Sequence, residues 1–159
     1  MRRGFYILLI LSAADATALA QRSHGYIYIA PGGVSGAGGS GMTLHLGGGG
    51  EFLLAKRVGV GVELGALGPR RSYVDSVVGV GSVNGSYHFK TSSEKIDPFV
   101  TAGYSLGFRT GTINFFNFGG GINYWFLSRL GLKLEIRDHV ASPNGGAVHF
   151  WGVRFGLAF

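Results

Sequence analysis

The chain has 159 residues, a length that suits one domain. Its 30 glycines lack the three-residue period of collagen, and 46% hydrophobic residues exclude a disordered glycine-rich chain. Cysteine is absent, so the fold must close without disulfide bonds. The formal net charge of +6 comes from basic residues scattered along the sequence, which favours weak attraction to anionic lipid headgroups over a nucleic-acid site.

The beginning of the chain has the layout of a secretory signal peptide. Two arginines form a short basic start, residues 4–14 are apolar except for one serine, and residues 18–20 offer the small side chains that a signal peptidase reads. We therefore expect a signal peptide over residues 1–20, cleaved before Gln21, and a mature domain over residues 21–159.

A membrane-anchoring helix is the alternative for this first segment. Such a helix needs about 20 apolar residues in a row. Asp15 and Thr17 end the apolar run too early, so cleavage is the favoured outcome. Because an exported chain rarely meets nucleic acid, we expect no nucleic-acid partner.

The mature part shows the two-residue period of β-strands and no convincing helix. The period predicts eight strands, which in chain order span residues 24–31, 41–54, 57–67, 75–90, 97–108, 114–126, 129–140 and 147–159. The pattern is clearest over residues 129–137, where four aliphatic side chains alternate with charged residues and glycine. The alternation changes parity near Ser82, which predicts a β-bulge there.

The expected connections between these strands form two sets. One set covers residues 55–56, 91–96 and 127–128; the other covers residues 32–40, 68–74, 109–113 and 141–146. The second set is on balance longer and richer in glycine, proline and arginine. Short periplasmic turns that alternate with longer outer loops are typical of outer-membrane barrels. With an even number of strands, both termini are then expected on the periplasmic side.

The two faces of the strands separate a membrane barrel from a soluble one. A soluble barrel hides its apolar face and exposes its charged face. Here the second face is made of glycine and charged residues, which suit the cramped interior of an eight-stranded barrel, while the bulky face suits lipid. Aromatic residues near the predicted strand ends are expected to form girdles at the membrane interfaces: Tyr26, Tyr28, Phe99, Phe108, Phe115, Phe116, Tyr124, Trp125, Phe126, Phe150 and Trp151.

The last residues resemble a known signal. The segment HFWGVRFGLAF ends on Phe159 and places Phe155 and Leu157 at alternate positions before it. It looks like the terminal signal by which the barrel assembly machinery recognises outer-membrane barrels. The mature chain as a whole resembles the small outer-membrane β-barrel superfamily of OmpA transmembrane domains and OmpX-like proteins.

This resemblance implies an all-β fold: an eight-stranded antiparallel up-and-down transmembrane β-barrel in the outer membrane of a Gram-negative bacterium, preceded by a cleavable signal peptide. It specifies architecture and no chemistry. The partners it implies are outer-membrane lipid, including lipopolysaccharide, and the barrel assembly machinery. Nothing in the sequence demands more than a monomer.

Charged residues on the inward face are expected to form a network in the barrel interior. Such charges must be paired or hydrated, because an isolated buried ion is costly. We interpret them as a structural plug, with a narrow ion-passing channel as the alternative. The members of this lumen charge network are Glu51, Glu63, Lys133, Glu135, Arg137 and Arg154.

The histidines and glycine runs carry no recognisable cofactor motif. The five histidines lie on separate strands without the spacing of a local metal motif, so no metal site is expected. The glycine runs lack the strand, turn and helix of a nucleotide site and are interpreted as bends and close-packing positions. We expect no cofactor.

The lipid A deacylases are the one enzyme family that needs comparison, because they are also eight-stranded barrels. They carry a His-x-Ser-Asn run and a later acidic residue. Here His139 and Ser142 are three residues apart, which places them on opposite faces of a strand, and no Asp or Glu follows Asp138. We therefore expect no enzyme and no catalytic residues, with deacylation kept as an alternative.

The favoured function is a non-enzymatic outer-membrane barrel with a role in envelope integrity or surface interaction. Arg70, Arg71 and Arg109 fall in expected outer loops and are candidate contacts for lipopolysaccharide phosphates or an external partner. The alternatives are a lipid A-modifying barrel enzyme and a narrow small-solute pore.

Overall fold

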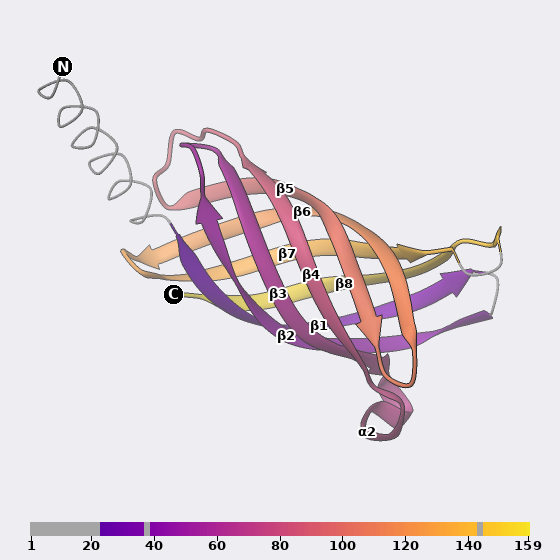
Figure 1. Ribbon diagram of the computed structural model, residues 1–159. Coiled ribbons are helices and arrows are strands. Elements are labelled where there is room, and N and C mark those ends of the chain that lie inside the picture. Colours follow the sequence, from indigo (N-terminus) through magenta and orange to yellow (C-terminus); the bar gives the residue numbers. More distant parts are fainter. Residues whose placement is uncertain (1–22, 37–38, 143–144) are drawn as a thin grey trace, which may run out of the picture.

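The computed structural model describes residues 23–36, 39–142 and 145–159, so the expected signal peptide lies outside the described residues. Eight antiparallel strands form one closed barrel (Figure 1). They are β1 (His24–Gly36), β2 (Gly39–Leu53), β3 (Val58–Pro69), β4 (Val78–His88), β5 (Ile96–Phe108), β6 (Thr112–Leu127), β7 (Leu130–Ala141) and β8 (Val148–Ala158). Between β3 and β4 lie a 3-10 helix, η1 (Arg70–Ser72), and a short helix, α2 (Tyr73–Ser76).

Each strand pairs with its neighbours in sequence, and the first strand pairs with the last. The closing seam joins β1 to β8 from Tyr26 opposite Ala158 to Gly36 opposite Val148. The eight-stranded up-and-down barrel expected from the sequence is therefore confirmed. No helix in the described residues is long and apolar enough to cross a membrane.

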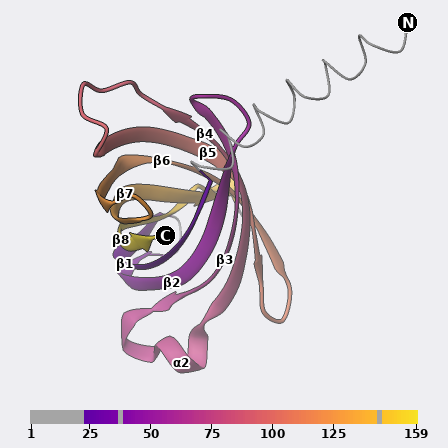
Figure 2. The same cartoon turned by 90° about the vertical axis from the view of Figure 1, so that its left-hand side faces the viewer.

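The barrel has two different ends, which we name by what they carry (Figures 1 and 2). The terminal end holds Phe159, the start of β1 and the turns over residues 54–57, 89–95 and 128–129. The loop end holds Gly36 and Gly39, η1 with α2, residues 109–111, and residues 142 and 145–147.

Three expectations about the connections and the register were wrong. The predicted loop over residues 32–40 is mostly strand, because β1 and β2 stay paired up to Gly36 opposite Gly39. These two glycines have φ angles of 139° and 109°, which side-chain-bearing residues rarely adopt, so glycine suits these two strand ends. The start of the fourth predicted strand is instead the helix α2, held by a 2.6 Å hydrogen bond that the Tyr73 hydroxyl donates to the Ala66 carbonyl.

The predicted bulge near Ser82 is also absent from the described pairing. β4 pairs continuously with both neighbouring strands. The parity change arises because Val80 is buried in the interior while Val83 faces outward. A register shift occurs instead between Trp125 and Leu127 of β6, at the terminal end.

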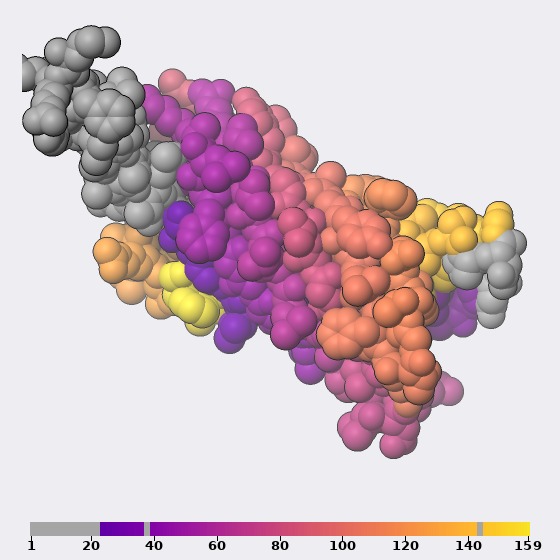
Figure 3. Space-filling model, in the orientation of Figure 1, coloured from indigo at the N-terminus to yellow at the C-terminus, as the bar shows by residue number. Residues whose placement is uncertain are grey.

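The polarity of the wall is that of a membrane barrel. On β7, the outward Leu132, Leu134 and Ile136 are 53%, 48% and 63% exposed. The intervening Lys133, Glu135 and Arg137 are at most 4% exposed and point inward. Outward side chains of neighbouring strands cover the wall on the side seen in Figure 3. A barrel whose apolar face is outside and whose charges are inside matches lipid as the surrounding solvent.

The aromatic girdles were only partly predicted. Five of the expected residues face outward and are exposed: Phe108, Phe116, Tyr124, Phe126 and Trp151. Tyr26, Tyr28, Phe99 and Phe115 are instead buried in the barrel interior, because they share the inward parity of their strands. Trp125 packs against the buried tyrosines, and Phe150 contacts Phe115 edge-on.

Candidate functional site

The centre of the barrel holds a cluster of four buried charged side chains, the central ion cluster. Glu63 on β3 accepts hydrogen bonds from Nη1 of both Arg137 and Arg154, at 3.0–3.1 Å. Arg137 Nε lies 2.5 Å from the Glu135 carboxylate, and Arg154 Nη1 lies 3.9 Å from it. Two carboxylates and two guanidinium groups thus meet without net charge, as burial of ions requires.

Aromatic side chains complete this cluster. The Tyr26 hydroxyl donates a 2.6 Å hydrogen bond to Glu63, which therefore has three donors. The Arg154 guanidinium stacks on the Tyr28 ring at 4.3 Å from its centroid. From the sequence both tyrosines were expected in the aromatic girdles. They lie inside the barrel because they alternate with outward Ile27 and face the same side of β1 as buried His24.

The other two members of the expected network lie nearer the terminal end. Lys133 contacts rings rather than a carboxylate: its Nζ lies 3.7 Å from the Phe99 centroid and 4.8 Å from that of Tyr26. Such cation–π contacts partly replace the hydration that the ammonium group loses. Glu51 pairs with His88 at 2.9 Å and also accepts a hydrogen bond from Ser86.

His88 extends this second polar group, which the sequence did not predict. Its Nδ1 lies 2.9 Å from Asp97, whose carboxylate also accepts a hydrogen bond from the Asn123 amide at 3.1 Å. His88 on β4 therefore bridges the carboxylates of Glu51 on β2 and Asp97 on β5. The sequence does contain a pattern that predicts this group: Glu51 and His88 each stand next to outward aromatic residues, so both side chains are expected to point inward.

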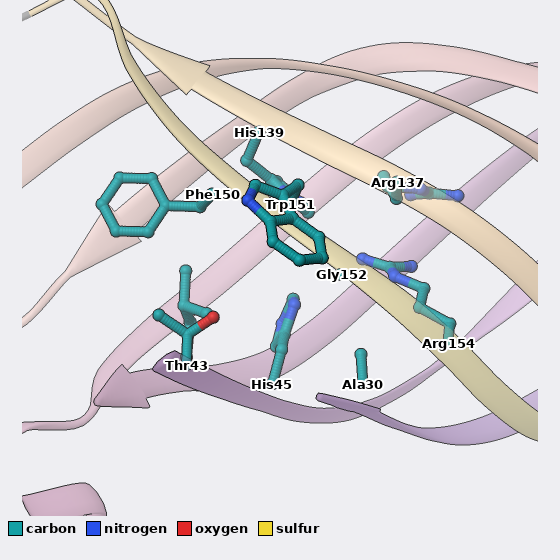
Figure 4. A pocket seen from close by; sticks show the side chains of 10 residues that line it. Ala30, Thr43, His45, Arg137, His139, Phe150, Trp151, Gly152 and Arg154 are labelled. Carbon is teal, nitrogen blue, oxygen red and sulfur yellow. The ribbon is translucent and has the colours of Figure 1, made fainter. Parts of the chain in front are cut away.

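Two further histidines lie on the loop-end side of the central ion cluster. The rings of His45 and His139 pack edge to face with centroids 5.6 Å apart, and His45 Nε2 lies 3.1 Å from the Tyr28 hydroxyl. Both line a cavity together with Arg137 and Arg154 (Figure 4). Its volume is about 10 Å³, roughly the space for one water molecule.

In the described residues the histidines do not form a metal site, and His139 is not placed for lipid hydrolysis. Within residues 23–36, 39–142 and 145–159, no group of three or more His, Cys, Asp or Glu side chains could hold a metal ion. His139, the residue compared with the deacylase motif, is 3% exposed inside the barrel. It therefore faces away from the lipid that a deacylase would have to reach. Asp138 faces outward and pairs with His149 at 2.7 Å.

The arginines expected in outer loops lie at the loop end. Arg70 and Arg71 are exposed on η1. Arg109, on the connection between β5 and β6, donates a hydrogen bond to the Asp75 carbonyl of α2. The structure thus brings Arg109 to the segment that carries the other two arginines. At the other end of the barrel, Phe155, Leu157 and Phe159 all face outward and are exposed.

No family model and no curated protein matches the chain. Among solved structures, neisserial surface protein A superposes with a TM-score of 0.69 at 13% identity, over 86% of this chain and 95% of that one. The N-terminal β-barrel domain of Pseudomonas aeruginosa OprF gives a TM-score of 0.57 at 18% identity, over 87% and 100%. Ail of Yersinia pestis gives 0.53 at 17% identity, over 86% and 97%.

These similarities define the class of protein. The chain has the fold of the small eight-stranded outer-membrane β-barrels, which matches the OmpA-like and OmpX-like resemblance of its sequence. Its apolar outward face agrees with that fold and with lipid as the surrounding medium.

The interior glycines supply a test of how tightly the central ion cluster is packed. A Cβ atom on Gly49 would lie 2.5 Å from the Val62 carbonyl oxygen and 3.0 Å from the Tyr26 hydroxyl. On the adjacent Gly50, which faces the other side of the strand, the nearest atom would be 3.8 Å away. We expect Gly49→Ala to lower the free energy of unfolding by about 1–3 kcal/mol in urea titrations of the detergent-folded barrel.

Gly50→Ala is the matched control and should change the free energy of unfolding by no more than about 0.5 kcal/mol. Equal losses in the two variants would show that the interior is not packed around the glycine.

Proposed function

We propose that this chain is a monomeric outer-membrane barrel that helps to keep the envelope tight and meets anionic molecules at the cell surface with its loop end. The observation that carries the proposal is a lipid-facing apolar wall around an interior filled by buried, ion-paired side chains. Such a barrel adds protein surface to the membrane without adding a hole in it.

The orientation in the membrane follows from how such a chain is delivered. It arrives from the periplasm, so an even number of strands leaves both termini there without moving either across the bilayer. The terminal end is then periplasmic and the loop end faces outward. The outward Phe155, Leu157 and Phe159 of the last strand are proposed as the signal that the assembly machinery recognises.

A closed lumen is the second part of the proposal. The interior of an eight-stranded barrel is just wide enough for side chains to fill it. Here the six residues of the lumen charge network are all buried, and none is more than 5% exposed. Arg137 lines cavities on both sides of the central ion cluster, and each cavity is only about 10 Å³ in volume. The mixed charges would also oppose the passage of either sign of ion.

We therefore expect negligible conductance from the purified, folded protein in a planar lipid bilayer. The reason is that buried side chains of both charges lie in the interior, and the two cavities that Arg137 lines are each only about 10 Å³ in volume. Detergent-only and heat-denatured samples are the controls for bilayer leakage. Stable, large single-channel currents would contradict the closed lumen and favour the narrow pore instead.

Surface contact is assigned to the loop end. Arg70, Arg71 and Arg109 lie there, and Asp75 carries the one exposed side-chain carboxylate among the described residues of this end. Guanidinium groups bind phosphate and sulfate through paired hydrogen bonds. Ail, which shares the fold, has been crystallised with the heparin analogue sucrose octasulfate, a polyanion. Lipopolysaccharide phosphates present the same kind of anionic group at this level of the membrane.

A deletion strain tests the proposed role. Loss of the gene should increase the entry of a large hydrophobic dye, while mass spectrometry of lipid A should show unchanged acyl chains. The wild-type gene should restore tightness fully, and a variant with Arg70→Gln, Arg71→Gln and Arg109→Gln should restore it only in part. Unchanged dye entry would contradict the envelope role, and altered acylation of lipid A would favour the deacylase alternative.

A further inference from the structure

The turns at the terminal end carry an excess of positive charge that the interior does not use. Five exposed basic residues lie there: Lys56, Arg57, Lys90, Lys95 and Arg129. We call them the basic belt. Glu94 is the one fully exposed carboxylate on these turns, so the belt and Glu94 together carry a net charge of +4.

The remaining side-chain carboxylates at this end already have hydrogen-bond or ion-pair partners. Glu51 is buried and pairs with His88, and Asp97 is held by His88 and the Asn123 amide. In the part of the chain that the structure describes, no ion pair joins a carboxylate to a residue of the basic belt. The positive charge of the belt is therefore available to an external anion.

The belt lies at the edge of the apolar wall. Leu54, Phe89, Ile96 and Leu127 are exposed, apolar and no more than two residues from a cation of the belt. Side chains at that level place their apolar stems against acyl chains and their charged groups among headgroups. The anion that they meet there is the phosphate of a lipid.

The arrangement of the belt around the barrel points to the same partner. Its residues lie on the turns between β2 and β3, β4 and β5, and β6 and β7, so successive turns are two strands apart along the closed sheet. A single soluble protein would cover one sector of such a ring. A shell of headgroups covers all of it, which favours lipid over a protein partner.

We propose that the basic belt binds anionic phospholipid headgroups in the leaflet at the terminal end, which is the periplasmic leaflet in the orientation inferred above. This goes beyond the proposed role of the loop end and of the closed lumen. It assigns the barrel a lipid preference that depends on charge, with phosphatidylglycerol as the simplest lipid of the required chemistry.

The preference is measured with spin-labelled lipids around the folded full-length mature chain in phosphatidylcholine bilayers. At low salt, spin-labelled phosphatidylglycerol should associate with the barrel about two- to fivefold more strongly than spin-labelled phosphatidylcholine. Replacing the five belt residues by glutamine should bring this ratio close to one. Glu94→Gln, which changes a charged residue on the same turns without removing a cation, is the control and should keep or raise the preference.

Heat-modifiable gel migration establishes that each variant is folded. If the five-site variant does not fold, salt supplies the second readout, since raising NaCl to about 0.5 M screens exposed charges and should bring the wild-type ratio close to one. A wild-type ratio of one at low salt, a preference that survives high salt, a folded five-site variant that keeps the preference, or a loss in Glu94→Gln equal to that of the five-site variant would each overturn the proposal. These outcomes concern lipid association alone, whereas the proposed function is tested by conductance and dye entry, so the two proposals can fail independently.

Discussion

The structure depends on one constraint: lipid offers no hydrogen-bond partner to a backbone. An open sheet edge in hydrocarbon would leave unpaired N–H and C=O groups that cost several kcal/mol each. The pairing of β1 with β8 removes that edge, and with eight strands it also fixes a narrow interior. Every polar side chain that the strand period sends inward must then find its partners within that space.

The central ion cluster is the outcome of this constraint. Glu63, with three donors, lies between two arginines that also face Glu135. Glycines opposite the large side chains make the arrangement possible, because a Cβ on Gly47 would lie 2.6 Å from the Tyr28 hydroxyl. The glycine runs that look like low complexity in the sequence are therefore the counterpart of the buried tyrosines and arginines.

The two rims differ from the interior in one respect: their cations are exposed and form no ion pair within the described part of the chain. At the loop end, Arg70 and Arg71 project from η1, while at the terminal end the basic belt borders the apolar wall. The barrel thus presents positive charge at both edges of its lipid-facing surface. Neutral interior, apolar wall and basic rims together describe a protein whose proposed partners are the anionic groups of the membrane itself.

The sequence predicted the fold well where large aliphatic and small or charged residues alternate. On β7 and β8 this alternation placed Leu134, Glu135 and Arg154 on their observed faces. It failed where the inward residue is itself large and apolar, as for Tyr26 and Phe99, because parity relative to neighbours rather than side-chain type decides the face. It also failed at the tip of β1 and β2, since glycine carries no side chain from which a face can be identified.

The partners within the interior could not be predicted from one strand at a time. Glu63 and Arg154 are 91 positions apart and meet only because the closed register aligns β3, β7 and β8. The same holds for His88, whose two carboxylate partners come from β2 and β5. Similar solved barrels share only 13–18% identity with this chain, which agrees with a fold set by alternation and closure rather than by particular residues.

The central claim is that the apolar face meets lipid, and spin labelling along β7 tests it most directly. Because the chain has no cysteine, single-cysteine variants at Leu132, Lys133, Leu134, Glu135 and Ile136 each carry one label. In lipid bilayers, collision with dissolved oxygen should be high at Leu132, Leu134 and Ile136 and low at the two intervening positions. The inverse pattern, or no two-residue period, would contradict the account.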